Sequence, residues 1–236
     1  MVEFKGIKKS FGKNQVLKGI DLTIEKGKTT AVLGPNGSGK TTLIKILLGM
    51  CIANDGKTLF DHKDIKNDWQ YRKAIDYLPQ IANFPENIKV KELINMIKDL
   101  RGQATRDQQL IDYFKLGPYL NSKLSNLSGG FKQKVNLVLT LMFDSDFIIL
   151  DEPTSGLDPV ALIKLKKLIQ EEQDKGKTIL ITSHIMDFVE EVSHQISFIL
   201  DGKVYFNGNT KELKTATRED NFEYAIAHLL KQEGNV

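Results

Sequence analysis

A chain of 236 residues is long enough for one domain with a sizeable core, or for one domain with an added lobe. Its 33 basic and 30 acidic residues leave a net charge of +3, a balance that neither requires nor excludes nucleic acid. The single cysteine, Cys51, excludes an intrachain disulfide. The first ten residues lack the apolar run of a signal peptide, and no apolar run approaches the roughly 20 residues that span a bilayer. We therefore expect a cytoplasmic chain that meets a membrane only through a partner.

The first third of the chain predicts strands and then a strand–loop–helix unit. Apolar residues alternate at Val2 and Phe4, and again at Ile20, Leu22 and Ile24, which indicates strands. The segment TTAVLGPNGSGKTTLIKILLG predicts a short apolar strand, a glycine-rich loop and a helix. Two further short strands are expected in KTLFDH and AIDYLPQ.

The middle of the chain has mainly helical sequence patterns. Apolar residues recur on one helical face at Val90, Leu93, Ile94, Ile97 and Leu100. The segment LSGGFKQKVNLVLTLMF predicts a second helix. We interpret residues 86–143 as a helical lobe inserted into the rest of the fold.

Strands and helices alternate again after the lobe. The apolar segments FIIL and TILITSH predict strands. Between them, Asp158 is expected to cap a helix that has Pro159 at its first position and Gly176 as its stop. The segment QISFILDGKVYFNG predicts a hairpin that turns at Asp201 and Gly202.

These elements predict an α/β fold with a mainly parallel sheet flanked by helices, an N-terminal antiparallel β region and the inserted helical lobe. The glycine-rich loop, whose P-loop pattern is described next, makes the core that of a P-loop NTPase. The catalytic α/β core would comprise residues 1–85 and 144–214, and a C-terminal helix would occupy residues 215–236. The apolar residues of that last helix are Phe222, Ile226, Leu229 and Leu230.

The most specific motif is the glycine-rich loop GPNGSGKTT. Its residues are Gly34, Pro35, Asn36, Gly37, Ser38, Gly39, Lys40, Thr41 and Thr42. They complete the P-loop pattern G-x-x-x-x-G-K-[ST], in which backbone N–H groups and a helix N-terminus cradle phosphates. Lys40 is expected to neutralise phosphate charge, and the Thr41 hydroxyl to bind Mg²⁺. Many classes of NTPase share this loop, so it does not name a chemistry on its own.

Polar residues follow several of the predicted strands, where ligands bind in parallel sheets. Asp151 is a candidate Mg²⁺ ligand, directly or through water, and Glu152 a candidate general base for the attacking water. Gln80 and His184 could both reach a γ-phosphate if their strands lie beside the P-loop strand, although each alone is more often an ordinary surface or core residue. Asp158 either only caps its helix or also faces a partner.

A second anion cradle is predicted at LSGG, residues 127–130, which we call the signature loop. Ser128, Gly129 and Gly130 open a helix there, an arrangement that holds anions on backbone N–H groups. Because the P-loop is already complete, the sequence raises the question of why one chain carries two such cradles.

The motifs GPNGSGKTT, Gln80, LSGG, ILDEP, SGLD and SH, in this order, resemble the ATP-binding subunit of an ABC transporter. The resemblance runs from Phe11 to His184 and implies one ATP-binding cassette over residues 1–236, an ATPase that uses ATP and Mg²⁺. It implies that Phe11 stacks on adenine and that Gln80 lies near Mg²⁺ and the attacking water. It also implies Glu152 as the base, His184 on the γ-phosphate and Asp158 across a subunit interface.

The same resemblance implies partners. Two copies would pack head to tail, so that each P-loop faces Ser128, Gly129 and Gly130 of the other copy and ATP is held between them. A membrane-spanning transporter subunit would hold the chain on the cytoplasmic face of the membrane, and no nucleic acid is expected. Ile81 and Phe84 follow Gln80 and are expected to line a groove for that subunit, unless they only pack against the lobe.

Some alternatives stay open from the sequence. Phe131 and not glutamine follows LSGG, and Gln133 comes two residues later, which leaves the side-chain contact at that position undefined. A cassette of this kind could also drive a process other than transport through a membrane or other protein partner. The hairpin sequence ILDGKVYFNG and the short chain resemble exporter-type cassettes more than importers. No feature of the sequence indicates the transported substrate.

Overall fold

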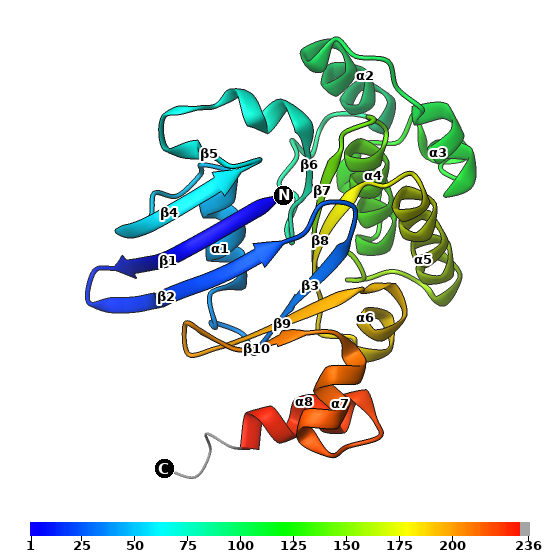
Figure 1. The fold of residues 1–236 in the computed structure, drawn as a ribbon. Coiled ribbons are helices and arrows are strands. Elements are labelled where there is room, and N and C mark those ends of the chain that lie inside the picture. Colours follow the sequence, from blue (N-terminus) through cyan, green and yellow to red (C-terminus); the bar gives the residue numbers. More distant parts are fainter. Residues whose placement is uncertain (232–236) are drawn as a thin grey trace.

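The computed structural model describes residues 1–231 as two sheets joined to a helical lobe (Figure 1). The strands are β1 (Val2–Phe11), β2 (Asn14–Ile24), β3 (Thr29–Leu33), β4 (Asp55–Phe60), β5 (Lys63–Asp64), β6 (Ile75–Leu78), β7 (Phe147–Asp151), β8 (Thr178–Thr182), β9 (Gln195–Leu200) and β10 (Lys203–Gly208). The helices are α1 (Lys40–Leu47), α2 (Val90–Arg101), α3 (Asp107–Tyr113), α4 (Gly129–Leu141), α5 (Pro159–Asp174), α6 (Met186–Val192), α7 (Thr210–Thr217) and α8 (Phe222–Lys231).

The N-terminal strands form the predicted antiparallel sheet, in the order β2-β1-β4-β5. Val2 pairs with Ile24 and Phe4 with Leu22, and these four side chains are all buried. Because successive side chains of a strand point to opposite faces, this alternation gives the sheet one apolar face.

The second sheet has the order β10-β9-β3-β8-β7-β6, and every neighbouring pair except β10 and β9 is parallel. Every residue of β3, β7 and β8 is buried, which is the pattern of strands that are covered on both faces. The carboxyl ends of β3, β6, β7 and β8 meet at one edge of this sheet. The P-loop, Gln80 and His184 follow those ends, and Asp151 is the last residue of β7.

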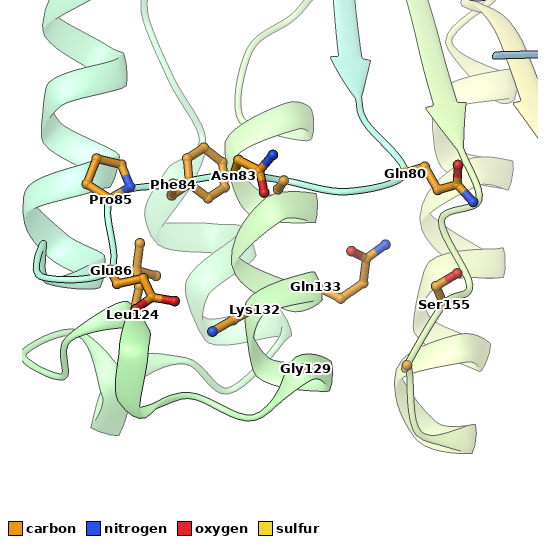
Figure 2. A pocket seen from close by; sticks show the side chains of 12 residues that line it. Gln80, Asn83, Phe84, Pro85, Glu86, Leu124, Gly129, Lys132, Gln133 and Ser155 are labelled. Atoms are coloured by element: carbon orange, nitrogen blue, oxygen red, sulfur yellow. The ribbon is translucent and has the colours of Figure 1, made fainter.

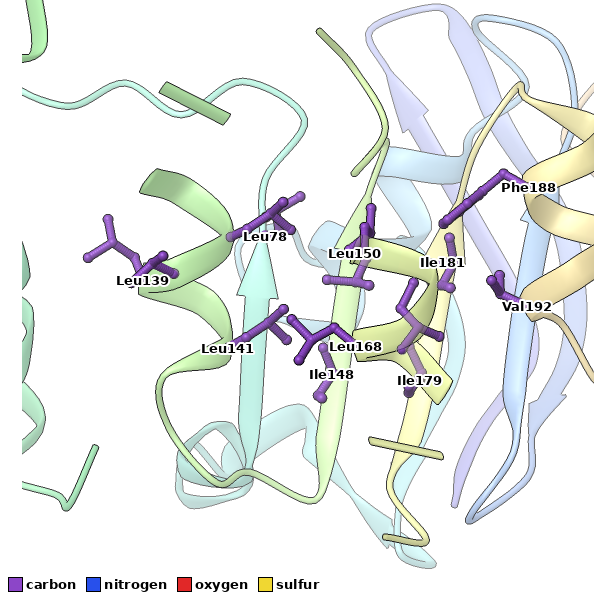
Figure 3. Close-up of a cluster of buried hydrophobic side chains, with 14 of the residues drawn as sticks. Leu78, Leu139, Leu141, Ile148, Leu150, Leu168, Ile179, Ile181, Phe188 and Val192 are labelled. Carbon is purple, nitrogen blue, oxygen red and sulfur yellow. The ribbon is translucent and has the colours of Figure 1, made fainter. Parts of the chain in front are cut away.

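Each face of the six-stranded sheet has its own apolar cluster. On one face, α1 packs between this sheet and the antiparallel sheet, with Leu43 and Leu47 among its buried residues. On the other face, side chains of β6, β7 and β8 meet those of α4, α5 and α6 (Figure 3). The helices α1 and α4 therefore lie on opposite sides of the same sheet (Figure 1).

The segment interpreted as the inserted lobe, residues 86–143, contains α2, α3 and α4. The prediction for α2 is right for Val90, Leu93 and Ile94, which are buried, but wrong for Leu100, whose exposed fraction is 75%. Arg101 takes the last inward position of the helix instead, with its guanidinium carbon 4.0 Å from the centre of the Phe143 ring. Because a helix has 3.6 residues per turn, neighbouring positions at the end of an apolar stripe can each be assigned to it from the sequence. Here the inward position is that of Arg101 and not that of Leu100.

The C-terminal region holds two helices where the sequence predicted one. α7 ends at Thr217, and Arg218 has a left-handed backbone with φ of 57° before α8 begins at Phe222. Phe222 and Ile226 are buried as expected, whereas 42% of Leu230 is exposed. The last part of the predicted helix, residues 232–236, lies outside the described residues.

Candidate functional site

The P-loop joins β3 to α1 in a conformation that needs glycine. Gly34, Gly37 and Gly39 have φ of 146°, 84° and 105°, values that residues with side chains rarely adopt. A Cβ on Gly34 would lie 2.0 Å from the carbonyl oxygen of Ile199, and one on Gly39 would lie 2.4 Å from Leu17. Neighbouring elements thus leave room only for the bare backbone, and the loop presents its amides to an incoming anion.

Lys40 is held within this loop. Its ammonium donates hydrogen bonds to the carbonyl oxygens of Gly34 at 2.7 Å and Pro35 at 3.0 Å. Burial lowers the pKa of Lys40, while the carboxylates of Glu152 and Asp151 act in the opposite direction. The Lys40 ammonium is therefore placed where the negative charge of a phosphate would compensate the cost of its burial. Phosphate oxygens would then replace the loop carbonyls as its hydrogen-bond acceptors.

Two further features of the loop fit a phosphate group. The Ser38 hydroxyl is buried and has no hydrogen-bond partner within the described residues. Pro35, Asn36 and Gly37 are exposed at the tip of the loop, and Thr42 lies in the first turn of α1. A buried polar atom without a partner is costly, and a phosphate oxygen would satisfy it.

Asp151 and Thr41 meet at the end of β7. The Thr41 hydroxyl lies 3.2 Å from Oδ2 of Asp151, and the buried Thr182 hydroxyl donates to the other carboxylate oxygen, Oδ1, at 2.6 Å. Hydroxyl and carboxylate oxygens are the ligands that Mg²⁺ takes from proteins, with water and phosphate filling its other positions. The described residues contain no cluster of three or more His, Cys, Asp or Glu side chains suited to a metal. The oxygens of Thr41 and Asp151 are of the kind that Mg²⁺ binds.

Glu152 turns away from the strand that carries Asp151. Its backbone has φ of 53°, a strained value for a glutamate, and its N–H donates to both the hydroxyl and the carbonyl oxygens of Thr182. Its buried side chain meets Nδ1 of His184 through Oε2 at 2.8 Å, while 72% of the His184 side chain is exposed. The structure thus brings the predicted base and the predicted γ-phosphate ligand into direct contact.

The signature loop ends at the start of α4. Ser128 caps this helix and accepts a hydrogen bond from the N–H of Phe131 at 3.4 Å, while Gly129 and Gly130 form its first turn. A Cβ on Gly130 would lie 2.6 Å from the carbonyl oxygen of Gly156. The N-terminus of α4 is therefore fixed against the loop that follows β7, and an anion placed there would meet free N–H groups of the first helical turn.

Side chains of α4 strengthen this attachment. Gln133 is buried and donates to the carbonyl oxygen of Pro153 at 3.0 Å, and Lys134 forms an ion pair of 2.7 Å with Asp158. Asp158 also caps α5 by accepting from the N–H of Ala161 at 2.8 Å. Hydrogen bonds from Lys134 and from the backbone lower the pKa of Asp158.

The remaining predicted residues lie at the margins of this arrangement. Phe11 is 54% exposed, and the ammonium of Lys9 lies 4.9 Å from the centre of its ring. Gln80 is exposed and lines a hollow of about 670 Å³ between α4 and the segment before α2. Figure 2 shows Gln80 and Ser155 at one end of this hollow, which we call the lobe–core hollow, and Leu124 at the other. The hollow is lined by Gln80, Ala82, Asn83, Phe84, Pro85, Glu86, Leu124, Gly129, Lys132, Gln133, Ser155 and Gly156.

The sequence analysis missed Thr182, which contacts the carboxylate of Asp151 and the backbone N–H of Glu152. Its signal was its position, because the last residue of a short, wholly buried strand lies beside the end of the neighbouring strand. Asp151 and Thr182 are cross-strand partners in the parallel β7–β8 pair. That register depends on which strands are neighbours, and the sequence alone does not give it.

Comparison with known proteins identifies the family. Residues 17–155 match the family model for ABC transporter. The L-cystine import ATP-binding protein TcyC of Bacillus subtilis (strain 168) is 31% identical over 245 aligned residues, which cover 98% of this chain and 99% of TcyC. The Nod factor export ATP-binding protein I of Rhizobium sp. (strain N33) is 30% identical over 218 residues, covering 90% of this chain and 72% of that protein. A solved ATP-binding subunit of an ABC transporter has a TM-score of 0.89 at 24% identity and covers 98% of this chain and 99% of its own.

The family model matches more than half of the chain, and the L-cystine relative matches it over nearly the full length of both proteins. None of the helices within residues 1–231 has the length and apolar character needed to cross a membrane. With its fold and its sequence motifs in agreement, the chain belongs to the ABC transporter family as an ATP-binding subunit, and it is an ATPase.

Proposed function

We propose that two copies of this chain close head to tail around ATP and Mg²⁺, and that hydrolysis reopens them to drive transport through a membrane-spanning partner. One observation carries the proposal. A complete P-loop stands beside Asp151 and Glu152 at one edge of the sheet, while a second helix N-terminus, at Ser128, begins a helix on the sheet's other face.

Each residue of the site has a role that follows from its contacts. Bound Mg²⁺ would offset the negative charge of the phosphates, with Thr41 and Asp151 holding it. The Lys40 ammonium would leave the carbonyl oxygens of the P-loop and bind phosphate oxygens. Glu152 would accept the proton of the attacking water, a role worth typically 10²–10⁴-fold in rate. His184 contacts Glu152 through Nδ1, so its Nε2 stays available for the γ-phosphate.

The remaining predicted residues would complete the nucleotide site. Phe11 is exposed at the end of β1 in the antiparallel sheet and would stack on adenine, a contact worth about 1–3 kcal/mol. Gln80 would approach Mg²⁺ and the attacking water when the lobe closes toward the core. Asp158, just before α5, would meet the second copy. Its ion pair with Lys134 would hold α4, the helix that begins at the signature loop, in line with the start of α5.

The membrane partner would dock in the lobe–core hollow. Phe84 lines this hollow and is half-buried against the main apolar cluster. Its position is compatible with the predicted groove for the partner and also with the alternative, that it only packs against the lobe. Ile81 is 74% exposed, immediately after Gln80. A helix seated in the hollow would press on the segment that carries Gln80, and this would connect the partner to the nucleotide. The partner would also hold the chain on the cytoplasmic face of the membrane.

We propose export as the direction of transport, on the exporter-like hairpin sequence of β9 and β10. The two relatives described above carry names of opposite direction, import and export, so they do not decide this point. Inside-out vesicles that contain the chain and its partner should accumulate solute from a labelled cell extract when ATP is added, and vesicles with Lys40→Ala should not. ATP-dependent loss of solute from the same vesicles would mean import.

The dimer proposal is tested with Glu152→Gln. The amide keeps the shape of the carboxylate but accepts no proton, so hydrolysis should slow by at least about a hundredfold and ATP should stay between the two copies. Sizing of this variant should show a dimer with Mg-ATP and a monomer with Mg-ADP or without nucleotide, since a ligand that bridges two chains favours dimers by mass action. Adding Ser128→Arg should abolish the dimer.

A matched control is Glu171→Gln, which makes the same substitution at an exposed position of α5. It should hydrolyse ATP at the wild-type rate and stay monomeric. Wild-type hydrolysis by Glu152→Gln would refute Glu152 as the base. A monomer at high concentration in Mg-ATP would refute closure by the isolated chain.

A further inference from the structure

Thr182 is wholly buried at the end of β8 and makes contacts with both carboxylate residues of the site. Its hydroxyl donates to Oδ1 of Asp151 at 2.6 Å and accepts from the N–H of Glu152 at 3.0 Å. The Thr182 carbonyl oxygen accepts from the same N–H at 3.1 Å. One residue thus contacts the side chain of the candidate metal ligand and the backbone of the candidate base.

We propose that Thr182 is the positioning residue of the site: its hydroxyl selects which oxygen of Asp151 faces the metal and fixes the turn that aims Glu152 at the attacking water. The proposal rests on the proposed function, because it concerns the same Mg²⁺ and the same base. It adds a residue that touches neither nucleotide nor metal.

The argument begins with Asp151. A carboxylate at the end of a strand can rotate and exchange its two oxygens. The hydrogen bond from Thr182 occupies Oδ1, which leaves Oδ2 toward the Thr41 hydroxyl at 3.2 Å. Partners of this kind orient metal ligands, and their loss typically costs 10–100-fold in metal affinity or activity.

The second half of the argument concerns Glu152. Its φ of 53° is a strained value that persists only where neighbouring groups hold the backbone in place. The N–H of Glu152 is divided between two oxygens of Thr182, and this anchors the first residue after β7 to the end of β8. A hydroxyl has one hydrogen and two acceptor sites, so it can donate to Asp151 and accept from Glu152 at the same time. A methyl group in its place can do neither.

The test compares Thr182→Val, which has nearly the same shape without the hydroxyl, with Thr182→Ser, which keeps it. The matched control is Thr178→Val on the same strand, where a buried threonine hydroxyl accepts from the N–H of Gly27 at 2.9 Å, away from the site. Five quantities are measured: kcat and KM for ATP, the half-saturating Mg²⁺ concentration, Mn²⁺ binding in the presence of ADP by electron paramagnetic resonance, and ATP binding in EDTA.

We expect Thr182→Val to weaken Mn²⁺ binding and raise the half-saturating Mg²⁺ concentration by roughly 10–100-fold, with a lowered kcat. ATP binding in EDTA should stay within about twofold of wild type, because the P-loop is untouched. Thr182→Ser should restore metal binding to within a few fold, and Thr178→Val should leave it unchanged. If Thr182→Val does not fold, Thr182→Ala provides the same comparison against Thr182→Ser.

Wild-type metal binding and wild-type kcat in a folded variant without the hydroxyl would overturn the proposal. An equal effect of Thr178→Val would overturn it too, because general damage to β8 would then explain the loss. These outcomes leave the proposed function standing as long as Glu152→Gln blocks hydrolysis. Hydrolysis by Glu152→Gln at the wild-type rate would instead remove the base assignment on which both depend.

Discussion

Glu172 is a buried carboxylate whose removal should destabilise the whole protein. It lies near the end of α5 with 1% of its side chain exposed, and it forms ion pairs with Arg106 at 2.7 Å, Lys175 at 2.9 Å and Lys177 at 2.6 Å. Arg106 precedes α3 in the lobe, and its Nε also donates to the carbonyl oxygen of Leu141 at 2.9 Å. The cluster therefore connects the lobe to the α/β core at the end of α5.

The size of the effect follows from the pKa of Glu172. Burial alone would raise this pKa, but hydrogen bonds from Arg106, Lys175 and Lys177 lower it from 4.5 to about 2. At 1.36 kcal/mol for each pH unit, the difference corresponds to about 3 kcal/mol of folding free energy at neutral pH. Glu172→Gln should lose about this amount, which for a chain of this length lowers Tm by about 6–12 °C.

The pH dependence has a definite sign. A carboxylate whose pKa is lowered by folding stabilises the protein at pH values above its unfolded pKa, and this stabilisation is lost as the pH falls through the folded pKa. The difference in unfolding free energy between wild type and Glu172→Gln should therefore be fully present above about pH 4.5 and shrink toward about pH 2.

Reversible urea unfolding at several pH values measures this difference. Glu171→Gln is the matched control, since the neighbouring exposed glutamate should change stability by less than about 0.5 kcal/mol. A loss below about 1 kcal/mol for Glu172→Gln at pH 7, or a loss that does not vary between pH 5 and pH 2.5, would refute the reasoning.

Two further predictions concern nucleotide and partner. Lys40→Ala should abolish ATP binding or turnover, because phosphate charge would stay uncompensated in the P-loop; isothermal titration with ATP and a phosphate-release assay measure this, and unchanged turnover would contradict it. Phe84→Asp should release the membrane subunit in a co-purification assay while ATP binding is retained, because it places a charge in the lobe–core hollow. Since Phe84 is half-buried, the variant's melting curve must show a folded protein, and a folded variant that retains the partner would count against the groove.

The parts of the fold that local sequence determines could be predicted. The P-loop, the strand before Asp151 and the helix capped by Asp158 each depend on neighbouring residues, and the structure has each element at the expected residues. The hairpin at Asp201 and Gly202 likewise follows from turn chemistry, and both residues have positive φ. A cap, a turn or a glycine-rich loop carries its own geometry, so it needs no knowledge of tertiary structure.

The parts that failed or were missed depend on neighbours far apart in the sequence. Leu100 was misassigned because Arg101 turns inward over Phe143, and a charged residue gives no apolar signal for this. The ring of Phe131, the residue after LSGG, lies 4.1 Å from that of Tyr119, and this packing accounts for an aromatic residue there. To predict the contact between Glu152 and His184, or the contacts of Thr182, one would have to know the order of the strands in the sheet.

The two anion cradles begin helices on opposite faces of one sheet, and this arrangement bears on why a single chain carries both. Gly39 caps α1 directly after β3, and Gly130 rests against Gly156 after β7, so both helices start near the carboxyl ends of the parallel strands. The six-stranded sheet nevertheless separates the two helices. In the proposed head-to-tail dimer, a nucleotide on the P-loop would meet the signature loop of the other chain. A two-fold axis supplies both loops at once, because each copy then gives its signature loop to the other and receives one in return.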